Sequence, residues 1–230
     1  MPDVLVAQLR DEFNRWAEAG RGEGMERDHL PIVEPMLTLM KLQPGETILD
    51  FGCGTGWLCR LLAARLPQSR VVGIDLSDEM IHRAQAASEG FTNVSFSTGS
   101  IQSIPSDNGF FTRAISVESA YYWPRPAEGL KEIFRVLAPG GSFWMLINYY
   151  HDNPYCHSWS SIFTIPTHLL SVSDWTALFH QAGFTHVASQ RIPDPTPVPE
   201  TYTGRWFGNA EELRRFRKEG ALLVYGTKST

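Results

Sequence analysis

Apolar and polar residues follow two alternating patterns from residue 46 onward. Five short runs have the length and composition of β-strands: 46–51, 71–75, 93–97, 114–119 and 142–148. Three longer segments between them carry apolar residues at helical spacing: 57–66, 78–88 and 127–137. This repeat is typical of a parallel sheet with helices on both faces, and the near-continuous apolar strands fit a sheet that is buried on both sides.

Residues 1–42 precede this repeat and have helical patterning. They predict two helices, around 3–19 and 28–41, separated by a glycine-rich stretch. We interpret residues 1–42 as an N-terminal helical cap on a domain that spans residues 43–230.

Residues 149–172 interrupt the repeat in the second half of the chain. The segment is rich in aromatic residues and histidine, contains two prolines and has no clear period. Residues 193–200 alternate proline with other residues, which predicts an extended connection. Because insertions beside the strand ends of such a sheet often enclose ligands, we predict that 149–172 is a lid-like insertion.

Composition narrows the class of protein. A chain of 230 residues, 43% hydrophobic, can bury one sizeable α/β domain. The formal net charge of −5 disfavours nucleic acid as a partner. Cys53, Cys59 and Cys156 form no C-x-x-C pair, so neither a metal site nor a disulfide framework is expected. No apolar run reaches membrane-helix length and the first residues do not resemble a signal peptide, so we expect a cytoplasmic protein without membrane contact.

A glycine-rich loop follows the first predicted strand and opens the first predicted helix of the repeat. Gly52, Gly54 and Gly56 are spaced G-x-G-x-G, whereas the dinucleotide fingerprint G-x-G-x-x-G requires a glycine where Trp57 stands. Asp50 precedes the first glycine by two residues. A carboxylate there pairs well with the ammonium group of an amino acid and poorly with a pyrophosphate, so the loop favours a ligand with an amino-acid moiety.

The residues D-F-G-C-G-T-G resemble motif I of the class I S-adenosylmethionine-dependent methyltransferases, in particular the small-molecule type with E/D-x-G-x-G-x-G. The resemblance covers residues 44–148 well and the rest of the chain more loosely. It implies a Rossmann-like, doubly wound, mostly parallel seven-stranded sheet with helices on both faces and an antiparallel last strand at 220–228. It also implies S-adenosylmethionine as cofactor, with S-adenosylhomocysteine as product.

The same resemblance predicts elements in the later part of the chain. Residues 171–187 are similar to the helix and sixth strand of the family, with Ser173 as the helix N-cap and Gly183 at its C-terminal end. The charged run at 211–220 is interpreted as the solvated face of another helix.

Positions along the strand ends give the expected cofactor site. An acidic residue at the end of the second strand, Asp75, can accept hydrogen bonds from both ribose hydroxyls, a role common to NAD and S-adenosylmethionine sites; a helix N-cap is the alternative. By resemblance, Leu76 and Met80 flank the adenine, although core residues would look the same. Ser100 stands where the family has an acidic residue that contacts the adenine amino group. The predicted cofactor-binding residues are Asp50, Gly52, Cys53, Gly54, Gly56, Asp75, Leu76, Met80, Ser100, Ile101 and Val117.

Candidate catalytic residues come from the irregular segments, because methyl transfer needs a base only where the acceptor must lose a proton. His151 and His157 are candidate bases near neutral pH, and each has the alternative of an ordinary packed or surface residue. Tyr122, in a run of three aromatic residues after the fourth strand, is a candidate for the acceptor pocket or for the core. Tyr149, Tyr150 and Trp159 are expected to line that pocket, with Trp16 and His29 closing it.

The leading hypothesis is a methyltransferase, monomeric or homodimeric, that acts on a small molecule, which the abundance of aromatic residues favours. One alternative is a non-catalytic binding or regulatory module that keeps the fold. Another is a nicotinamide-dependent oxidoreductase, which the third-glycine position disfavours. Methylation of protein or RNA remains open, with RNA disfavoured by the acidic balance.

Overall fold

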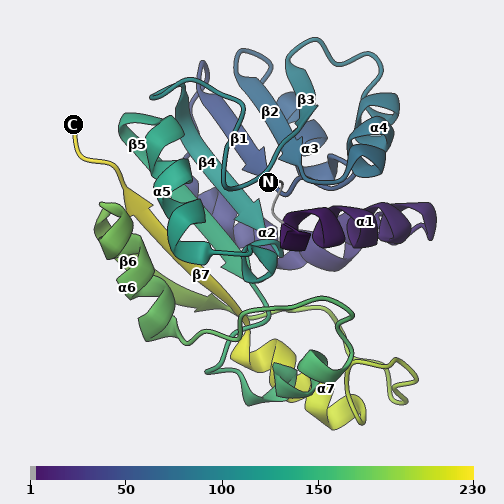
Figure 1. Cartoon of the computed structure of the whole chain (residues 1–230). Helices are drawn as coiled ribbons and strands as arrows, with labels where there is room; N and C mark the ends of the chain where they lie inside the picture. Colours follow the sequence, from purple (N-terminus) through teal and green to yellow (C-terminus); the bar gives the residue numbers. More distant parts are fainter. Residues whose placement is uncertain (1–3) are drawn as a thin grey trace.

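Seven strands form one sheet in the order β3-β2-β1-β4-β5-β7-β6 in the computed structural model, which describes residues 4–230 (Figure 1). The strands are β1 (Thr47–Phe51), β2 (Arg70–Asp75), β3 (Val94–Thr98), β4 (Phe111–Val117), β5 (Leu137–Ile147), β6 (Thr185–Ile192) and β7 (Ala221–Thr227). β3, β2, β1, β4 and β5 pair in parallel, and β7 runs antiparallel to both neighbours, β5 and β6. The expected doubly wound sheet with an antiparallel last strand is confirmed.

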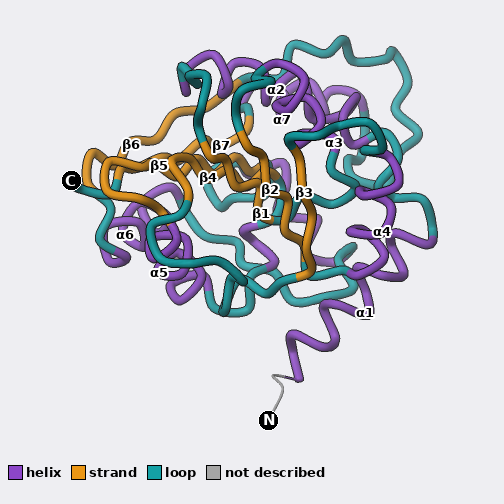
Figure 2. The backbone as a smooth tube through the Cα atoms, turned by 90° about the horizontal axis from the view of Figure 1, so that it is seen from above, coloured by secondary structure: helices purple, strands orange, loops and turns teal. Residues whose placement is uncertain are grey.

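Helices cover both faces of this sheet. They are α1 (Val4–Glu18), α2 (Met25–Met40), α3 (Trp57–Arg65), α4 (Asp78–Ala87), α5 (Pro126–Val136), α6 (Val172–Ala182) and α7 (Ala210–Glu219). Two short 3₁₀ helices, η1 (Ala120–Tyr122) and η2 (Pro154–Ser161), follow β4 and β5. Figure 2 shows α2 and α3 on one side of the strands and α5 and α6 on the other.

Alternating side chains divide the core between these two faces. On β1, Ile48 packs into the cluster that holds the apolar faces of α2 and α3. Its neighbours Leu49 and Phe51 point the other way, into the cluster with α5 and α6. All three are nearly fully buried, which explains why the strands read as continuous apolar runs instead of alternating ones.

Two sequence expectations in the second half of the chain are wrong. Ser171, not Ser173, is the N-cap of α6, because the Ser171 hydroxyl accepts from the Asp174 amide at 3.1 Å and Asp174 accepts from the Ser171 amide at 2.9 Å. This reciprocal capping box satisfies two backbone donors that a cap at Ser173 would leave open. β5 also begins at Leu137, five residues before the expected 142, and its pairing with β4 shifts register between Leu137 and Ser142.

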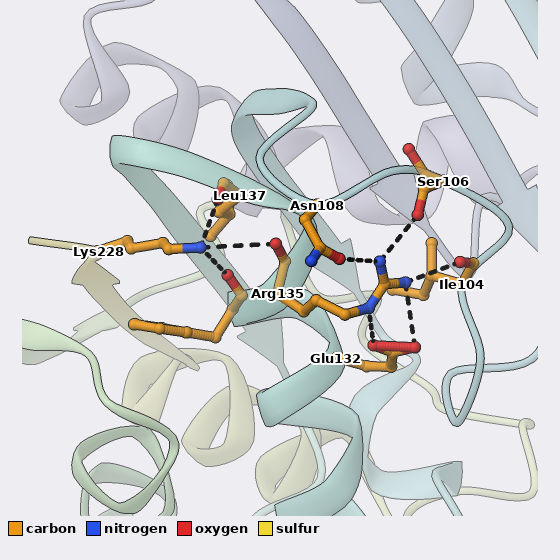
Figure 3. A network of polar contacts seen from close by, with 8 residues as sticks. Ile104, Ser106, Asn108, Glu132, Arg135, Leu137 and Lys228 are labelled. Carbon is orange, nitrogen blue, oxygen red and sulfur yellow. Dashed lines mark hydrogen bonds and ion pairs between the residues drawn. The ribbon is translucent and has the colours of Figure 1, made fainter. Parts of the chain in front are cut away.

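Charged side chains hold the C-terminal end of α5 (Figure 3). The Lys228 ammonium, just after β7, donates to the carbonyls of Phe134 at 2.8 Å and Leu137 at 2.7 Å. These are carbonyls that a helix end leaves without intrahelical donors. The Arg135 guanidinium donates on its other side to the loop between β3 and β4, at the carbonyls of Ile104 and Ser106 and the side chain of Asn108.

The two N-terminal helices pack against different parts of the domain. α2 contributes Val33 and Met36 to the core, whereas α1 lies against α4 (Figure 1). The side-chain oxygen of Asn14, on α1, accepts from the Ser77 hydroxyl at 2.6 Å and from the Glu79 amide at 3.3 Å, both at the start of α4. The proposed division between a 1–42 cap and a 43–230 domain stays a prediction.

Candidate functional site

The site lies where the strand order reverses. β2 and β3 extend to one side of β1 and β4 and β5 to the other, so the connections after β1 and β4 diverge and leave a crevice at the carboxyl ends of the strands. The glycine-rich loop follows β1 there, Asp75 ends β2, and Glu118 follows β4.

All three motif glycines adopt positive φ angles: +79° at Gly52, +53° at Gly54 and +74° at Gly56. A Cβ on Gly52 would lie 2.2 Å from the Ser119 hydroxyl oxygen, and one on Gly56 would lie 2.7 Å from the Phe96 ring. Packing therefore requires glycine at both positions. Gly54 differs, because the nearest atom to its Cβ would be the Met25 sulfur at 3.8 Å, and so its open side faces the cavity described below.

Asp75 links the glycine-rich loop to the start of α4. One carboxylate oxygen accepts from the Gly54 amide at 2.9 Å, and the other accepts from the Ser77 amide at 2.9 Å. Ser77 is itself the N-cap of α4, its hydroxyl accepting from the Met80 amide. Burial raises the pKa of Asp75, and the backbone donors oppose that rise. The carboxylate keeps lone pairs for further donors at the cavity wall.

Asp50 is an almost fully buried carboxylate beneath the loop, 2% exposed. Its protein partner is the Cys59 thiol, which donates to Oδ2 at 3.2 Å. Burial raises the pKa of Asp50 to about 7, with a contribution from the neighbouring Asp75. A buried carboxylate with so weak a donor is poised to accept a cation that enters the cavity.

Two adjoining cavities lie against the loop. The glycine-loop cavity is lined on the sheet side by Asp50, Gly52, Cys53, Gly54, Asp75, Met80, Val117 and Glu118. The Ser100 cavity is lined there by Gly52, Asp75, Leu76, Ser100 and Ile101. Every residue predicted to bind the cofactor therefore lines one of the two, except Gly56, which starts α3 and packs on Phe96.

The helical cap closes these cavities from the other side. Phe13 of α1 lines both, and Trp16 of α1 with Met25 and His29 of α2 completes the glycine-loop cavity. With α1 and α2 in this position, the volume of the glycine-loop cavity is about 100 Å³ and that of the Ser100 cavity is about 50 Å³. Small-molecule sites measure roughly 300–1,000 Å³, so we expect α1 to move outward when a ligand of that size enters.

A third and larger cavity, of about 470 Å³, adjoins the glycine-loop cavity. We call it the aromatic cavity, after the rings that line it: Trp16, Tyr121, Tyr122, Trp159, Phe163, Trp206, Phe207 and Phe216. Trp16, Met25, His29, Glu118 and Tyr122 line both this cavity and the glycine-loop cavity. A ligand on the loop and a second ligand among the rings would therefore meet at these side chains.

Glu118 is the charged group at that junction. Its Oε1 accepts from the Asn148 amide at 2.6 Å and its Oε2 from the Tyr121 hydroxyl at 3.0 Å. Its φ of +54° is rare for a residue with a side chain, and such conformations cost on the order of 1–3 kcal/mol and cluster at functional sites. Burial raises its pKa to about 7. The sequence analysis missed Glu118, although an acidic residue at the end of the fourth predicted strand was a usable signal.

Tyr122, predicted as a candidate, lines all three cavities. Its ring lies edge-on to Phe13, Trp16 and Phe163, with centroid distances of 5.4, 5.7 and 5.7 Å. Burial raises the pKa of Tyr122, so the phenol stays protonated near neutral pH. It can donate a hydrogen bond and shape the junction, but it is a poor base.

His151 and His157 lie elsewhere. Their rings are 5.2 Å apart, and a ring nitrogen of His157 contacts the His151 carbonyl at 2.7 Å. His151 is exposed, and neither residue lines any of the three cavities. Of the other residues expected around an acceptor, Trp159, Trp16 and His29 line the aromatic cavity, whereas Tyr149 and Tyr150 are buried in the core.

Within residues 4–230, no three or more His, Cys, Asp or Glu side chains lie together so as to hold a metal ion. Over the same residues, no helix is both long and apolar enough to cross a membrane.

Comparisons with known proteins agree with this geometry. Residues 48–141 match a family model described as a methyltransferase domain. The chain is 33% identical over 138 residues to 24-methylenesterol C-methyltransferase 3 of Arabidopsis thaliana, covering 56% of this chain and 38% of the relative. It is 33% identical over 145 residues to demethylmenaquinone methyltransferase of Symbiobacterium thermophilum, covering 60% and 54%. The chain spans about a third to a half of the length of the curated relatives it matches.

A solved structure matches over nearly the whole chain. It is a chain in the complex between the Haloferax volcanii Trm112 methyltransferase activator and a protein assigned as a methyltransferase. The sequence identity is 32%, the TM-score is 0.87, and the match covers 95% of this chain and 98% of that one. Taken with the glycine loop and the sheet order, this likeness means that the chain belongs to the class I S-adenosylmethionine-dependent methyltransferases.

Proposed function

We propose that the protein transfers a methyl group from S-adenosylmethionine to a small-molecule acceptor bound in the aromatic cavity. The observation that carries this proposal is the shared wall of the two cavities, where Glu118 and Tyr122 border both the loop and the rings. The names of the relatives add support, since two of them are sterol and quinone methyltransferases. A cavity lined by aromatic side chains suits a small organic molecule better than a polymer.

The residues around the loop fit the cofactor. The buried Asp50 carboxylate would pair with the ammonium group of the methionine part, and Asp75 would accept from the ribose hydroxyls through its remaining lone pairs. Leu76 and Met80 would flank the adenine, with Ser100 and Ile101 reading its amino group in the adjoining cavity. When bound, the cofactor supplies a methyl group activated by a sulfonium. The chain's own residues supply alignment and exclusion of water.

Glu118 is the proposed proton acceptor at the junction. Its carboxylate is oriented by the Asn148 amide and the Tyr121 hydroxyl, and its pKa of about 7 is suited to accept a proton from a hydroxyl or amine near neutral pH. This role replaces the proposed bases His151 and His157, which line none of the cavities.

Calorimetric titration tests the cofactor site. S-adenosylhomocysteine should bind the wild type in the micromolar range, and Asp75→Asn should weaken binding by tenfold or more because one accepting oxygen is lost. Asp78→Asn is the matched control, since Asp78 is exposed in the first turn of α4 and lines none of the cavities. NADH should not bind. Binding of NADH instead would favour the oxidoreductase alternative, and no binding of either would favour the non-catalytic module.

Turnover tests the role of Glu118. With an acceptor in hand, Glu118→Gln should keep the affinity for S-adenosylhomocysteine but lower kcat, and should remove the rise of kcat as pH increases through about 7. His151→Gln should leave kcat unchanged. A lower kcat for His151→Gln, with an unchanged kcat for Glu118→Gln, would mean instead that the base lies in the 149–172 segment.

We also propose that the chain binds a small activator protein, because the solved relative of 32% identity was found with one. The outer edge of β3 has no neighbouring strand within the described part of the sheet, and an unpaired edge is a template for another chain. Gel filtration with and without the Trm112 activator tests this, and co-elution would support it. A cytoplasmic monomer or homodimer stays the prediction for the chain alone.

A further inference from the structure

Two guanidinium groups line the aromatic cavity without a carboxylate partner. Arg21 follows α1, and Arg205 lies in the segment before α7; both are exposed. Among the described residues, no acidic side chain forms an ion pair with either one. The other charges of the cavity are already matched, since Arg217 pairs with Asp194 at 3.0 Å and Asp28 pairs with Arg27 at 2.8 Å. The charges of the cavity that lack an ion-pair partner are therefore two cations and Glu118, and Arg21 also lies close enough to Glu12 to lower the pKa of that carboxyl.

Each free guanidinium is stacked on a tryptophan of the cavity wall. The Arg21 guanidinium carbon lies 4.7 Å from the centre of the Trp16 ring, and that of Arg205 lies 4.8 Å from the centre of the Trp206 ring. These contacts fix where the positive charge stands relative to the rings. They also occupy one face of each of these two indoles. The two positive charges disfavour a protonated amine at either end of the cavity.

The rings between the two tryptophans form a continuous wall. Ring centroids are 5.7 Å apart for Trp16 and Tyr122, 5.7 Å for Tyr122 and Phe163, and 5.8 Å for Phe163 and Trp206. Both ends of this wall carry a guanidinium, and its middle, at Tyr122, borders the glycine-loop cavity and Glu118. The wall suits a flat apolar body whose reactive group faces Glu118 and whose opposite side carries negative charge.

From this arrangement we infer that the acceptor is an organic acid: a flat, apolar or aromatic body with a hydroxyl or amine next to Glu118 and a carboxylate or phosphate held at one end of the wall, by Arg21 or by Arg205. The inference rests on the proposed function and names the substrate class of the same site. Guanidinium groups recognise both carboxylate and phosphate through paired N–H donors, so the shared chemistry is the anion.

Binding to the protein preloaded with S-adenosylhomocysteine tests the inference without turnover. The probes are 6-hydroxy-2-naphthoate, its neutral methyl ester, 6-hydroxy-2-naphthyl phosphate and the cationic 6-(aminomethyl)-2-naphthol. We expect the two anions to bind at least about tenfold more tightly than the ester, as charge-assisted contacts allow, and the amine to bind most weakly. The ratio of the affinities for 6-hydroxy-2-naphthoate and 6-hydroxy-2-naphthyl phosphate then shows whether the site prefers a carboxylate or a phosphate.

Variants connect this preference to the two arginines. At least one of the variants Arg21→Met and Arg205→Met should reduce the preference for anion over ester, and the double variant should abolish it. Arg10→Met, an exposed arginine of α1 outside the cavities, should leave it unchanged. Equal or absent binding of all probes, tighter binding of the amine, or a preference that survives the double variant would overturn the inference. If S-adenosylhomocysteine itself does not bind, the proposed function fails instead, which separates the two results.

Discussion

Glu12 of α1 and Thr164 of the segment after β5 share a hydrogen bond across 152 residues of sequence, with the Thr164 hydroxyl donating to Oε1 of Glu12. The same oxygen accepts from the Trp16 indole at 2.7 Å, and Oε2 pairs with Arg15 at 2.6 Å. The bond to Thr164 lowers the pKa of Glu12. It fastens α1, which closes the glycine-loop cavity, to the 149–172 segment, which lines the aromatic cavity.

Breaking this contact should make the cap open more easily. Because we expect α1 to move outward when a ligand enters, Thr164→Val should raise both the association and the dissociation rate of S-adenosylhomocysteine. The global free energy of unfolding should fall by about 1.5–3 kcal/mol, the value of a hydrogen bond to a charged group. Stopped-flow fluorescence, with Trp16 as reporter, measures the rates. Thr164→Ser keeps the hydroxyl and should behave like the wild type; unchanged rates in Thr164→Val would mean that α1 opens without releasing Thr164.

The pKa of Asp50 links cofactor affinity to pH. The ionised carboxylate pairs with an ammonium group, so acidification below a pKa of about 7 should weaken binding of S-adenosylhomocysteine, by about tenfold per pH unit well below that value. The amino group of the ligand stays protonated below about pH 7.7, so the change from pH 7.5 to 5.5 reports the protein. Calorimetry at both values should show the fall in wild type and in Glu118→Gln. Asp50→Asn should bind weakly at every pH.

The same carboxylate should destabilise the unliganded protein at high pH. An acid whose pKa is raised by folding contributes stability below its unfolded value near 4, and this contribution is lost as pH rises through about 7. Asp50→Asn should therefore raise the melting temperature of the unliganded protein at pH 8, and raise it less at pH 5.5. Thermal unfolding followed by circular dichroism provides the measurement. A lower melting temperature at pH 8 would mean that hydrogen bonding to the ionised form outweighs burial.

The loop residues were predictable because their geometry is local. Asp50, Gly52 and Gly54 lie within five positions, and the turn that joins a parallel strand to its helix fixes them relative to each other. Asp75 was predictable for a related reason, because adjacent parallel strands end at the same edge of the sheet.

The acceptor side was less predictable because distant segments build it. Trp16, Phe163 and Trp206 meet only after α1, the 149–172 segment and the connection to α7 have folded over the sheet. Nothing in the local pattern around Trp206 distinguishes it from any other aromatic residue in a connecting segment. His151 is the opposite case, since a suitable side chain in a suitable segment is exposed and lines none of the three cavities.

Steric contact at Gly52 should be separable from backbone strain. Gly52 and Gly45 both have strongly positive φ, +79° and +86°, but a Cβ on Gly45 would meet nothing within 4 Å. Gly45→Ala should therefore cost about 1 kcal/mol in the free energy of unfolding, from conformation alone. Gly52→Ala should cost at least 1 kcal/mol more, because its Cβ would lie 2.5 Å from that of Ser119. Urea denaturation measures both, and adding Ser119→Gly should recover most of the difference; equal costs would contradict the clash.

Substitution of Lys228 should lower the stability of the protein without changing its affinity for S-adenosylhomocysteine. Its ammonium donates to the carbonyl of Leu137 (Figure 3) and to that of Phe134 at the end of α5. The centre of the Phe134 ring lies 4.7 Å from the Lys228 nitrogen. Lys228→Met should lower the free energy of unfolding by about 1–3 kcal/mol, since partly buried carbonyls lose a charged donor. The exposed Lys131→Met should change it by less than about 0.5 kcal/mol. Because Lys228 lines none of the cavities, its variant should bind S-adenosylhomocysteine like the wild type; weakened binding would mean that the end of α5 and the cofactor site are coupled.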